Sequence, residues 1–218
     1  MIHPNTILNY ISPEIGFGVV ATKFIPKGTI TWVGDPLDQI FSPEKLGQLP
    51  SAFKEIVDIY SYRDNLGNFI LCWDHSRFVN HSFLSNCMST AYNFELAVRN
   101  IFPGEELTDD YGYLNLIEPF DCIQEKGSNR KQALPNDLLN FHQVWDGQLK
   151  DAFAFFKKVD QPLWPFIENQ YQSTVSEVGD NPLVMDSILQ CYYSGIKSLN
   201  RGLLSSITEK NSIRDKTA

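Results

Sequence analysis

RFVNHS at residues 77–82 and EELTDDYG at residues 105–112 are the two segments that decide the fold of this sequence. The Asn80 side chain carries both a hydrogen-bond donor and an acceptor, which suits it to grip a polar ligand. Upstream, GFG at residues 16–18 lets the backbone approach a ligand closely. Taken singly, each segment has an ordinary structural explanation: a glycine turn, a polar turn, or a core tyrosine at Tyr111. All three in this order favour one ligand site in one small β domain.

The first ~120 residues have the pattern of short strands joined by turns. Residues 21–28 and 97–104 share the spacing Ala-x-x-x-Ile-x-x-Gly, and each runs through a turn marked by Pro and Gly. We expect them to form two similar strand–turn–strand corners. Alternating apolar residues over 93–99 predict a half-buried strand.

A helical insert is expected at about residues 42–60. Ser42 is a suitable N-cap and Pro43 a suitable first helical residue, whereas Pro50 should break or kink the apolar run that follows. Residues 64–68 then predict a hairpin turn between two short strands.

The pattern changes after Asp121. A helix is expected to start at Asn136 and to continue to Phe156, and a second is expected from Asn181 to about Leu203. The predicted organisation is a β domain at residues 1–122, a linker at 123–135, a helical region at 136–206 and a disordered tail at 207–218.

Together, the three segments resemble the signatures of the SET-domain protein-lysine methyltransferases, and the resemblance covers roughly residues 14–122. It implies an α+β protein with the SET β-clip fold: short strands, small sheets and a threaded C-terminal motif, here followed by an all-helical C-terminal region. The activity that it implies is S-adenosylmethionine-dependent methylation of a lysine side chain on a protein, such as a histone or another basic protein.

The resemblance also implies roles for individual residues. It assigns the contacts with S-adenosylmethionine to Gly16, Phe17, Gly18, Asn80, His81, Tyr111 and Phe120. It assigns catalysis to Tyr111, whose hydroxyl would lie near the methyl group and the lysine nitrogen. Backbone carbonyls would make weak C–H···O contacts with that methyl group.

Three aromatic residues are candidates for the lysine channel. Trp32 occupies a position where the family usually has Tyr, so the hydroxyl is lost and bulk is added. Tyr60 and Tyr62 either line the channel, where aromatic faces attract a methylated ammonium, or pack within a strand. The number of methyl groups transferred stays open.

The sequence departs from the family pattern at several positions. Phe83 and Ser85 replace the usual Cys and Pro, which alters packing more than chemistry. Phe120-Asp121-Cys122 resembles the start of the cysteine-rich segment that binds zinc in some members, but only Cys122 is present. We therefore expect no metal, and we expect the helices after Asn136 to close the site.

Methyl transfer needs a neutral amine, and neutralising a free lysine at pH 7 costs about 4–5 kcal/mol. Burial beside a sulfonium cation lowers the lysine pKa through desolvation and like charge. A general base is then not strictly necessary.

Composition limits the partners. The 218 residues carry a formal charge of −8, which disfavours nucleic-acid binding and is compatible with a basic protein substrate, although it also simply favours solubility. The four cysteines are widely spaced, as expected of free thiols. No signal peptide or apolar span is apparent, so we expect a cytoplasmic protein without membrane contact; delivery to another compartment or host cell, and the oligomeric state, stay open.

Two other functions are alternatives to methyl transfer. A hydrolase built on His75-Ser76 or His81-Ser82 is disfavoured because no Gly-x-Ser-x-Gly elbow is present. A SET-like module that binds cofactor or peptide without turnover remains an alternative because Trp32 alters the channel.

Overall fold

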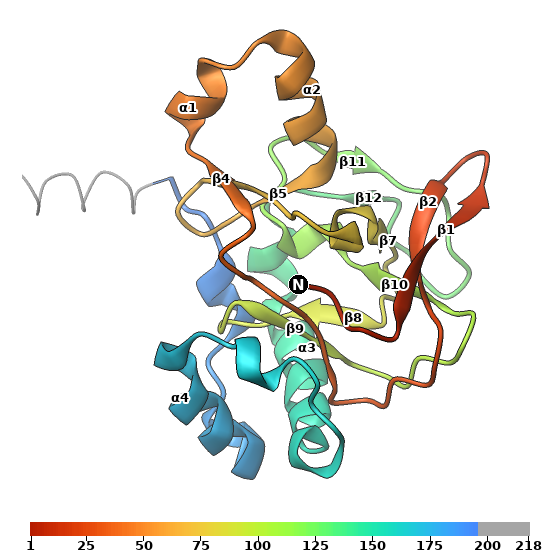
Figure 1. The fold of residues 1–218 in the computed structure, drawn as a ribbon, viewed down its shortest axis with the longest axis vertical. Coiled ribbons are helices and arrows are strands. Elements are labelled where there is room, and N and C mark those ends of the chain that lie inside the picture. The colour runs from red at the N-terminus through yellow and green to blue at the C-terminus, as the bar shows by residue number, and fades with distance from the viewer. Residues whose placement is uncertain (196–218) are drawn as a thin grey trace, which may run out of the picture.

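The computed structural model describes residues 1–195, which form small sheets of short strands with helices at opposite ends (Figure 1). The helices α1 and α2 lie at the top of this view, and α3 and α4 lie below the sheets. The β-rich front and helical back predicted from the sequence are both present. The part of the helical region beyond residue 195, and the predicted tail, lie outside the described residues.

One sheet brings the two motif segments together. It has the order β1 (Thr6–Ser12), β2 (Gly16–Ala21), β10 (Glu106–Asp109) and β7 (Asn80–His81). β10 pairs antiparallel with β2 and parallel with β7, where Thr108 lies opposite Asn80 and Asp109 opposite His81. The glycine-rich, Asn80 and Tyr111 segments are therefore neighbours in one sheet.

The two repeated corners pair with each other. The backbone N–H groups of Ile25 and Ile101 each donate to the other's carbonyl at 2.9 Å, while Gly28 donates to Ala97 and Gly104 donates to Ala21, each at 2.8 Å. Gly28 and Gly104 have φ values of 87° and 84°, which residues with a side chain rarely adopt. The repeated spacing thus encodes a reciprocal contact that closes the β domain.

A second sheet separates two hydrophobic clusters. Its order is β3 (Ile30–Val33), β9 (Phe94–Ala97) and β8 (Cys87–Ser89). Phe94 and Leu96 of β9 pack in the cluster that contains α3, whereas Ala97 belongs to the cluster around β2. The prediction that this strand is half-buried was wrong: all four residues of β9 are buried, because both faces are covered.

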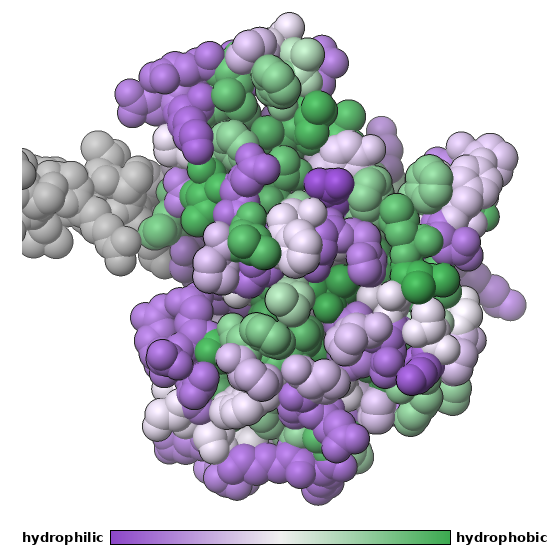
Figure 2. All heavy atoms as spheres, viewed as in Figure 1, coloured by the Kyte–Doolittle hydropathy of each residue, from purple (hydrophilic) through white to green (hydrophobic). Residues whose placement is uncertain are grey.

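The helical insert is broken in the way that Pro50 predicts. It consists of α1 (Pro43–Gly47) and α2 (Ser51–Tyr60), and the Ser42 side chain caps α1 by accepting from the Lys45 backbone N–H at 3.1 Å. On the face shown in Figure 2, hydrophobic residues are visible on this insert. Phe53 and Ile56, which follow the helical spacing of the sequence, are exposed, and only Val57 of α2 is buried.

The predicted hairpin is also present. β5 (Ser61–Arg63) and β6 (Phe69–Leu71) pair antiparallel, and β4 (Gln39–Phe41) completes this third sheet. Asp64 closes the turn by accepting from the Leu66 and Asn68 backbone N–H groups, each at 2.8 Å. A two-stranded ribbon, β11 (Phe120–Asp121) and β12 (Gln132–Ala133), follows the Tyr111 segment.

The back half differs in part from the prediction. The first helix, α3 (Asp137–Phe153), begins where expected but ends before Phe156. The sequence pattern does not predict α4 (Asn169–Asp180), because the helix is mostly polar and only Val175 and Val178 are buried. Leu138, Leu149 and Phe153 are fully buried against the β3–β9–β8 sheet and α4, so the helices are part of the core.

The helix predicted from Asn181 is wrong within the described residues. Short 3₁₀ helices occupy Pro182–Val184 and Ile188–Cys191 instead. The Asp186 backbone N–H donates to the Tyr92 hydroxyl at 2.7 Å, and that of Ile188 donates to Asp146 Oδ1 at 2.8 Å. These tertiary hydrogen bonds take donors that a continuous helix would need. Among residues 1–195, no helix has the length and hydrophobicity that a membrane span requires.

Candidate active site

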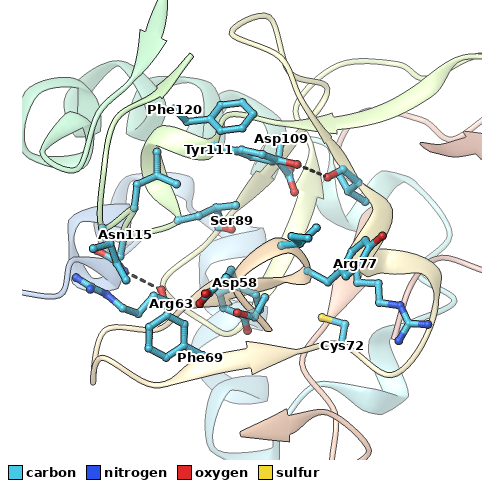
Figure 3. Close-up of a pocket in the computed structure, with 18 of the residues that line it drawn as sticks. Asp58, Arg63, Phe69, Cys72, Arg77, Ser89, Asp109, Tyr111, Asn115 and Phe120 are labelled. Carbon is cyan, nitrogen blue, oxygen red and sulfur yellow. Dashed lines mark hydrogen bonds between the residues drawn. The ribbon is translucent and has the colours of Figure 1, made fainter. Parts of the chain in front are cut away.

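A cavity of about 770 Å³ opens where the insert hairpin, the β3–β9–β8 sheet and the Tyr111 segment meet (Figure 3). Its wall includes all three predicted channel aromatics, Trp32, Tyr60 and Tyr62, together with Tyr111 and Phe120. Trp32 and Tyr62 pack edge to face with ring centroids 5.8 Å apart, and Tyr60 packs similarly on Phe78. The added bulk of Trp32 therefore leaves the cavity open.

Tyr111 stands at one side of this cavity at the end of β10. Its hydroxyl donates to the Val79 carbonyl at 2.9 Å, and its backbone N–H donates to His81 Nδ1 at 3.1 Å. Asp110 fixes the turn that carries Tyr111, because its side chain accepts from the Gly112 backbone N–H at 2.9 Å. Burial, with a smaller contribution from the charge of Asp109, raises the pKa of Tyr111. The hydroxyl is therefore neutral and held in one direction.

Aromatic rings connect Tyr111 to His81. The His81 ring lies 5.2 Å from the Tyr111 ring, 6.0 Å from Phe120 and 4.4 Å from Phe83, between ring centroids. Burial lowers the pKa of His81, which keeps the imidazole neutral. Its Nε2 is buried without a hydrogen-bond partner, although a buried polar atom normally has one. Phe83, where the family has Cys, thus packs directly on the motif histidine.

Asn80 belongs to a cluster outside the cavity wall. Its Nδ2 donates to the Phe17 carbonyl at 3.0 Å and to Glu106 Oε1 at 2.6 Å. Because both N–H groups of the amide are used, its Oδ1 is the atom left to accept from a ligand. Glu106 stands in the predicted motif, but the sequence analysis gave it no role.

Gly16, Phe17 and Gly18 form the backbone side of this cluster. A Cβ on Gly18 would overlap Glu106 Oε1 and lie 2.9 Å from Asn80 Nδ2, so a glycine is needed for the contact between these side chains. Gly16 has a φ of 83°, which also favours glycine. The Phe17 side chain is half exposed and packs edge to face on Tyr10. The predicted cofactor residues of this strand and of β7 are thus adjacent.

Two buried carboxyl groups line the cavity next to Tyr111 and were not predicted. Glu95 and Asp109 are 9% and 5% exposed, and both are part of the cavity wall. Figure 3 shows Asp109 beside Tyr111. The alternating sequence pattern does not predict that Glu95 is buried, because it indicates a strand with Glu95 on the solvent-facing side.

Arg130 holds the Tyr111 segment to the helical region. Its guanidinium pairs with both Asp110 and Asp137, whose carboxylates are 1% and 2% exposed. It also lies over the rings of Phe83 and Phe141, 4.3 and 4.6 Å from their centroids. The linker between β11 and α3 therefore contributes a buried ion network to the site.

Within the described residues, no group of three or more His, Cys, Asp or Glu side chains is arranged to hold a metal ion. Cys122 is accompanied by no other cysteine, and Cys72 lies in the cavity wall as a free thiol.

Comparison with known proteins identifies the front half. A family model described as the SET domain matches residues 16–112. Among solved structures, the chain is similar to a crystal structure from Plasmodium falciparum of a protein proposed to be a histone methyltransferase, with 21% identity and a TM-score of 0.38. That match covers 50% of this chain and 95% of the other. No curated protein matches the chain.

Proposed function

Residues 16–112 belong to the SET-domain family, and we propose that this protein methylates a lysine side chain of a protein substrate with S-adenosylmethionine as donor. The observation that carries the proposal is the position of Tyr111. It lines the cavity on one side and bonds through its backbone to His81, the neighbour of Asn80, on the other. A ligand at Asn80 and a side chain in the cavity would meet at this tyrosine.

The Asn80 cluster fits the amino-acid part of S-adenosylmethionine. A free Asn80 Oδ1, the Glu106 carboxylate and the Phe17 carbonyl are acceptors that suit an α-ammonium group. The half-exposed Phe120, whose ring packs on Tyr111 and His81, is proposed to cover the adenine. The unpartnered His81 Nε2 marks a polar position between these rings.

The cavity fits a lysine side chain. Trp32, Tyr60 and Tyr62 provide aromatic walls for the four-carbon stem, and an ammonium or methylammonium group gains from such faces. We propose a protein segment that presents a lysine as the partner, with a basic character that complements the charge of −8. The threaded arrangement of the family is likewise proposed here, on the parallel pairing of β10 with β7.

In this proposal the bound cofactor supplies a methyl group on a sulfonium, and the protein supplies position and electrostatics. The Val79 carbonyl accepts from the Tyr111 hydroxyl and so fixes a side chain that lines the cavity. Closure by the aromatic rings of Phe120 and His81 excludes water from the meeting point.

The test is transfer of a labelled methyl group from S-adenosylmethionine to the proteins of a lysate. Tyr111→Phe is expected to lower transfer by about 10²-fold, as loss of one preorganised hydroxyl does. Tyr192→Phe is the matched control, because its hydroxyl also makes one hydrogen bond, to Asn136 Oδ1, on an exposed surface. It should transfer as the wild type does.

Equal labelling by wild type and Tyr111→Phe would contradict the role of Tyr111. Cofactor binding without labelling by either would favour the binding module over the enzyme.

A further inference from the structure

The cavity wall contains a row of side chains that runs across three strands. Trp32 of β3 lies opposite Glu95 of β9, which lies opposite Ser89 of β8. Directly paired residues of neighbouring strands project to the same face of a sheet. All three residues line the cavity, and Ser89 Oγ donates to Glu95 Oε1 at 3.2 Å. The sheet therefore presents one polar row to the substrate space.

Asp109 meets this row from β10. Its carboxyl lines the cavity together with that of Glu95, and it accepts from the Tyr113 hydroxyl at 3.0 Å. Two carboxyl groups buried near each other do not both ionise readily, because their like charges repel. Burial is the largest cause that raises both pKa values: that of Asp109 to about 6, and that of Glu95 well above its usual range. Near neutral pH, Glu95 therefore keeps the proton and Asp109 is an ionised acceptor.

Other titratable groups surround this pair. Burial raises the pKa of Tyr113 and of the Cys87 thiol, and the charge of Asp109 adds to the rise in both cases, so neither competes as an acid. The charged or titratable groups that act on Asp109, Glu95 or their neighbours from the adjoining elements are the partly exposed Met1 ammonium, Tyr62, Cys87, Arg99, Glu106, Asp110 and Tyr111. No buried cation neutralises the pair in this set.

The other ionisable groups of the cavity are poorly suited to accept a proton from the substrate. The Tyr111 hydroxyl is already committed to Val79, and burial raises its pKa. Burial raises the pKa of the Cys72 thiol to about 12 and that of Tyr62 well above its usual range. The carboxylates of Asp58 and Glu118 also line the cavity, but both residues are solvent-exposed.

Trp32 adds an unpartnered polar group to this wall. Trp32 is 6% exposed, and its Nε1 is buried without a hydrogen-bond partner. This donor lies in the residue directly opposite Glu95. A buried N–H group is normally satisfied, so Trp32 Nε1 is an unmet hydrogen-bond donor within the wall itself.

We propose that Asp109, supported by Glu95, accepts the proton of the substrate ammonium group in the cavity. The N–H bond of the ammonium breaks, an O–H bond forms on Asp109, and the nitrogen keeps the electron pair with which it then attacks the methyl group. Two neutral carboxylic acids and a neutral amine result before transfer. As the methyl group moves, the positive charge passes from the sulfonium to the nitrogen. This inference rests on the proposed methyl transfer.

The test is the pH dependence of kcat with the full chain. Asp109→Asn, which keeps the size of the side chain, should lower kcat at pH 7 by about 10²-fold. The deficit should shrink as the pH rises towards 10, because solvent then deprotonates the amine. Glu95→Gln keeps a neutral side chain of the same size beside Asp109. Its kcat should stay within about fivefold of the wild type, a deficit well below the range for loss of a general base. Asp160→Asn, exposed and outside the cavity wall, is the matched control and should show the wild-type profile.

A pH profile of Asp109→Asn parallel to that of the wild type, with cofactor affinity and folding unchanged, would overturn the inference. A second measurement covers the case in which the wild type transfers no methyl group. Carboxyl ¹³C NMR of the protein with n-butylamine should show the Asp109 resonance moving to its protonated position on binding. Binding of the amine without that movement, or no binding at millimolar amine, would also overturn it.

Discussion

The Asn80 cluster and the Glu95–Asp109 wall lie on either side of Tyr111, and they are built in opposite ways. In the Asn80 cluster, both amide N–H groups have partners, at Phe17 and Glu106, and the group is partly open to solvent. In the wall, two carboxyl groups and an unpartnered Trp32 N–H are buried together. The first arrangement has both amide donors satisfied and leaves Asn80 Oδ1 for a ligand, whereas in the second burial raises the pKa of both acids.

The two regions therefore depend on different properties: one on backbone shape and the other on protonation. The Asn80 cluster depends on the shape of its backbone, because Gly18 leaves the room that the Glu106 side chain occupies. A buried pair of acids depends on pH, because desolvation sets its protonation. The three predictions below separate the two regions.

The largest effect is expected from cutting the connection between the Tyr111 segment and α3. Arg130→Met leaves the carboxylates of Asp110 and Asp137 buried without their cation. Breaking such a network costs about 3–5 kcal/mol of the free energy of unfolding, and the partial exposure of Arg130 places the loss at the lower end. Urea denaturation of the purified protein measures it.

Arg99→Met is the control for that experiment, because the ion pair of Arg99 with Glu105 is largely exposed. Its loss should cost less than about 1 kcal/mol. Similar losses for the two variants would show that the Arg130 network does not hold the Tyr111 segment in place.

The next effect concerns the Asn80 cluster alone. Gly18→Ala places a Cβ where Glu106 Oε1 now lies, so the flexible Glu106 side chain must leave Asn80. Loss of one charge-assisted hydrogen bond of about 1.5–3 kcal/mol should weaken S-adenosylmethionine binding by about 10-fold or more, as measured by calorimetry.

Gly147→Ala in α3 provides the matched substitution, because a Cβ there meets no atom within 4 Å. Its cofactor affinity should equal that of the wild type. An unchanged affinity in Gly18→Ala would place the cofactor away from Glu106.

The smallest effect is expected from the acid wall and concerns stability against pH. The folded pKa of Asp109 is raised from 3.8 to about 6, so between these values the folded protein holds a proton that the unfolded chain releases. The free energy of unfolding from this group therefore falls as the pH rises, by on the order of 1–3 kcal/mol. Asp109→Asn should show a smaller fall between pH 4 and pH 7 in urea titrations.

Comparing the variant with the wild type matters because His3 acts in the opposite direction. Burial lowers its pKa to about 4, so its contribution to stability rises with pH. This contribution is common to both proteins and cancels in the difference. A fall of equal size in both would mean that Asp109 is not the group that titrates.

Much of the front half could be predicted, because local sequence determines it. The Asn80 and Tyr111 segments, the Pro50 break and the hairpin at Asp64 each depend on residues close together in the chain. The repeated corners were recognised as alike, but their reciprocal pairing through Ile25 and Ile101 depends on tertiary structure.

The missed features depend on contacts between distant segments. Tyr92 and Asp146 take the backbone donors of residues 186 and 188, which no local pattern near Asn181 reveals. Glu95 was expected to face solvent, and its burial follows only from the elements that cover β9. Glu106 and Arg130 also gain their partners only in the folded chain.

The most direct test of the account uses S-adenosylmethionine with a deuterated methyl group, purified protein and mass spectrometry of the modified substrate proteins. We expect the labelled methyl group on lysine side chains, and about 10²-fold less of it when Tyr111 is replaced by Phe. Label on another residue type, or a wild-type protein that binds the cofactor and labels nothing, would contradict it.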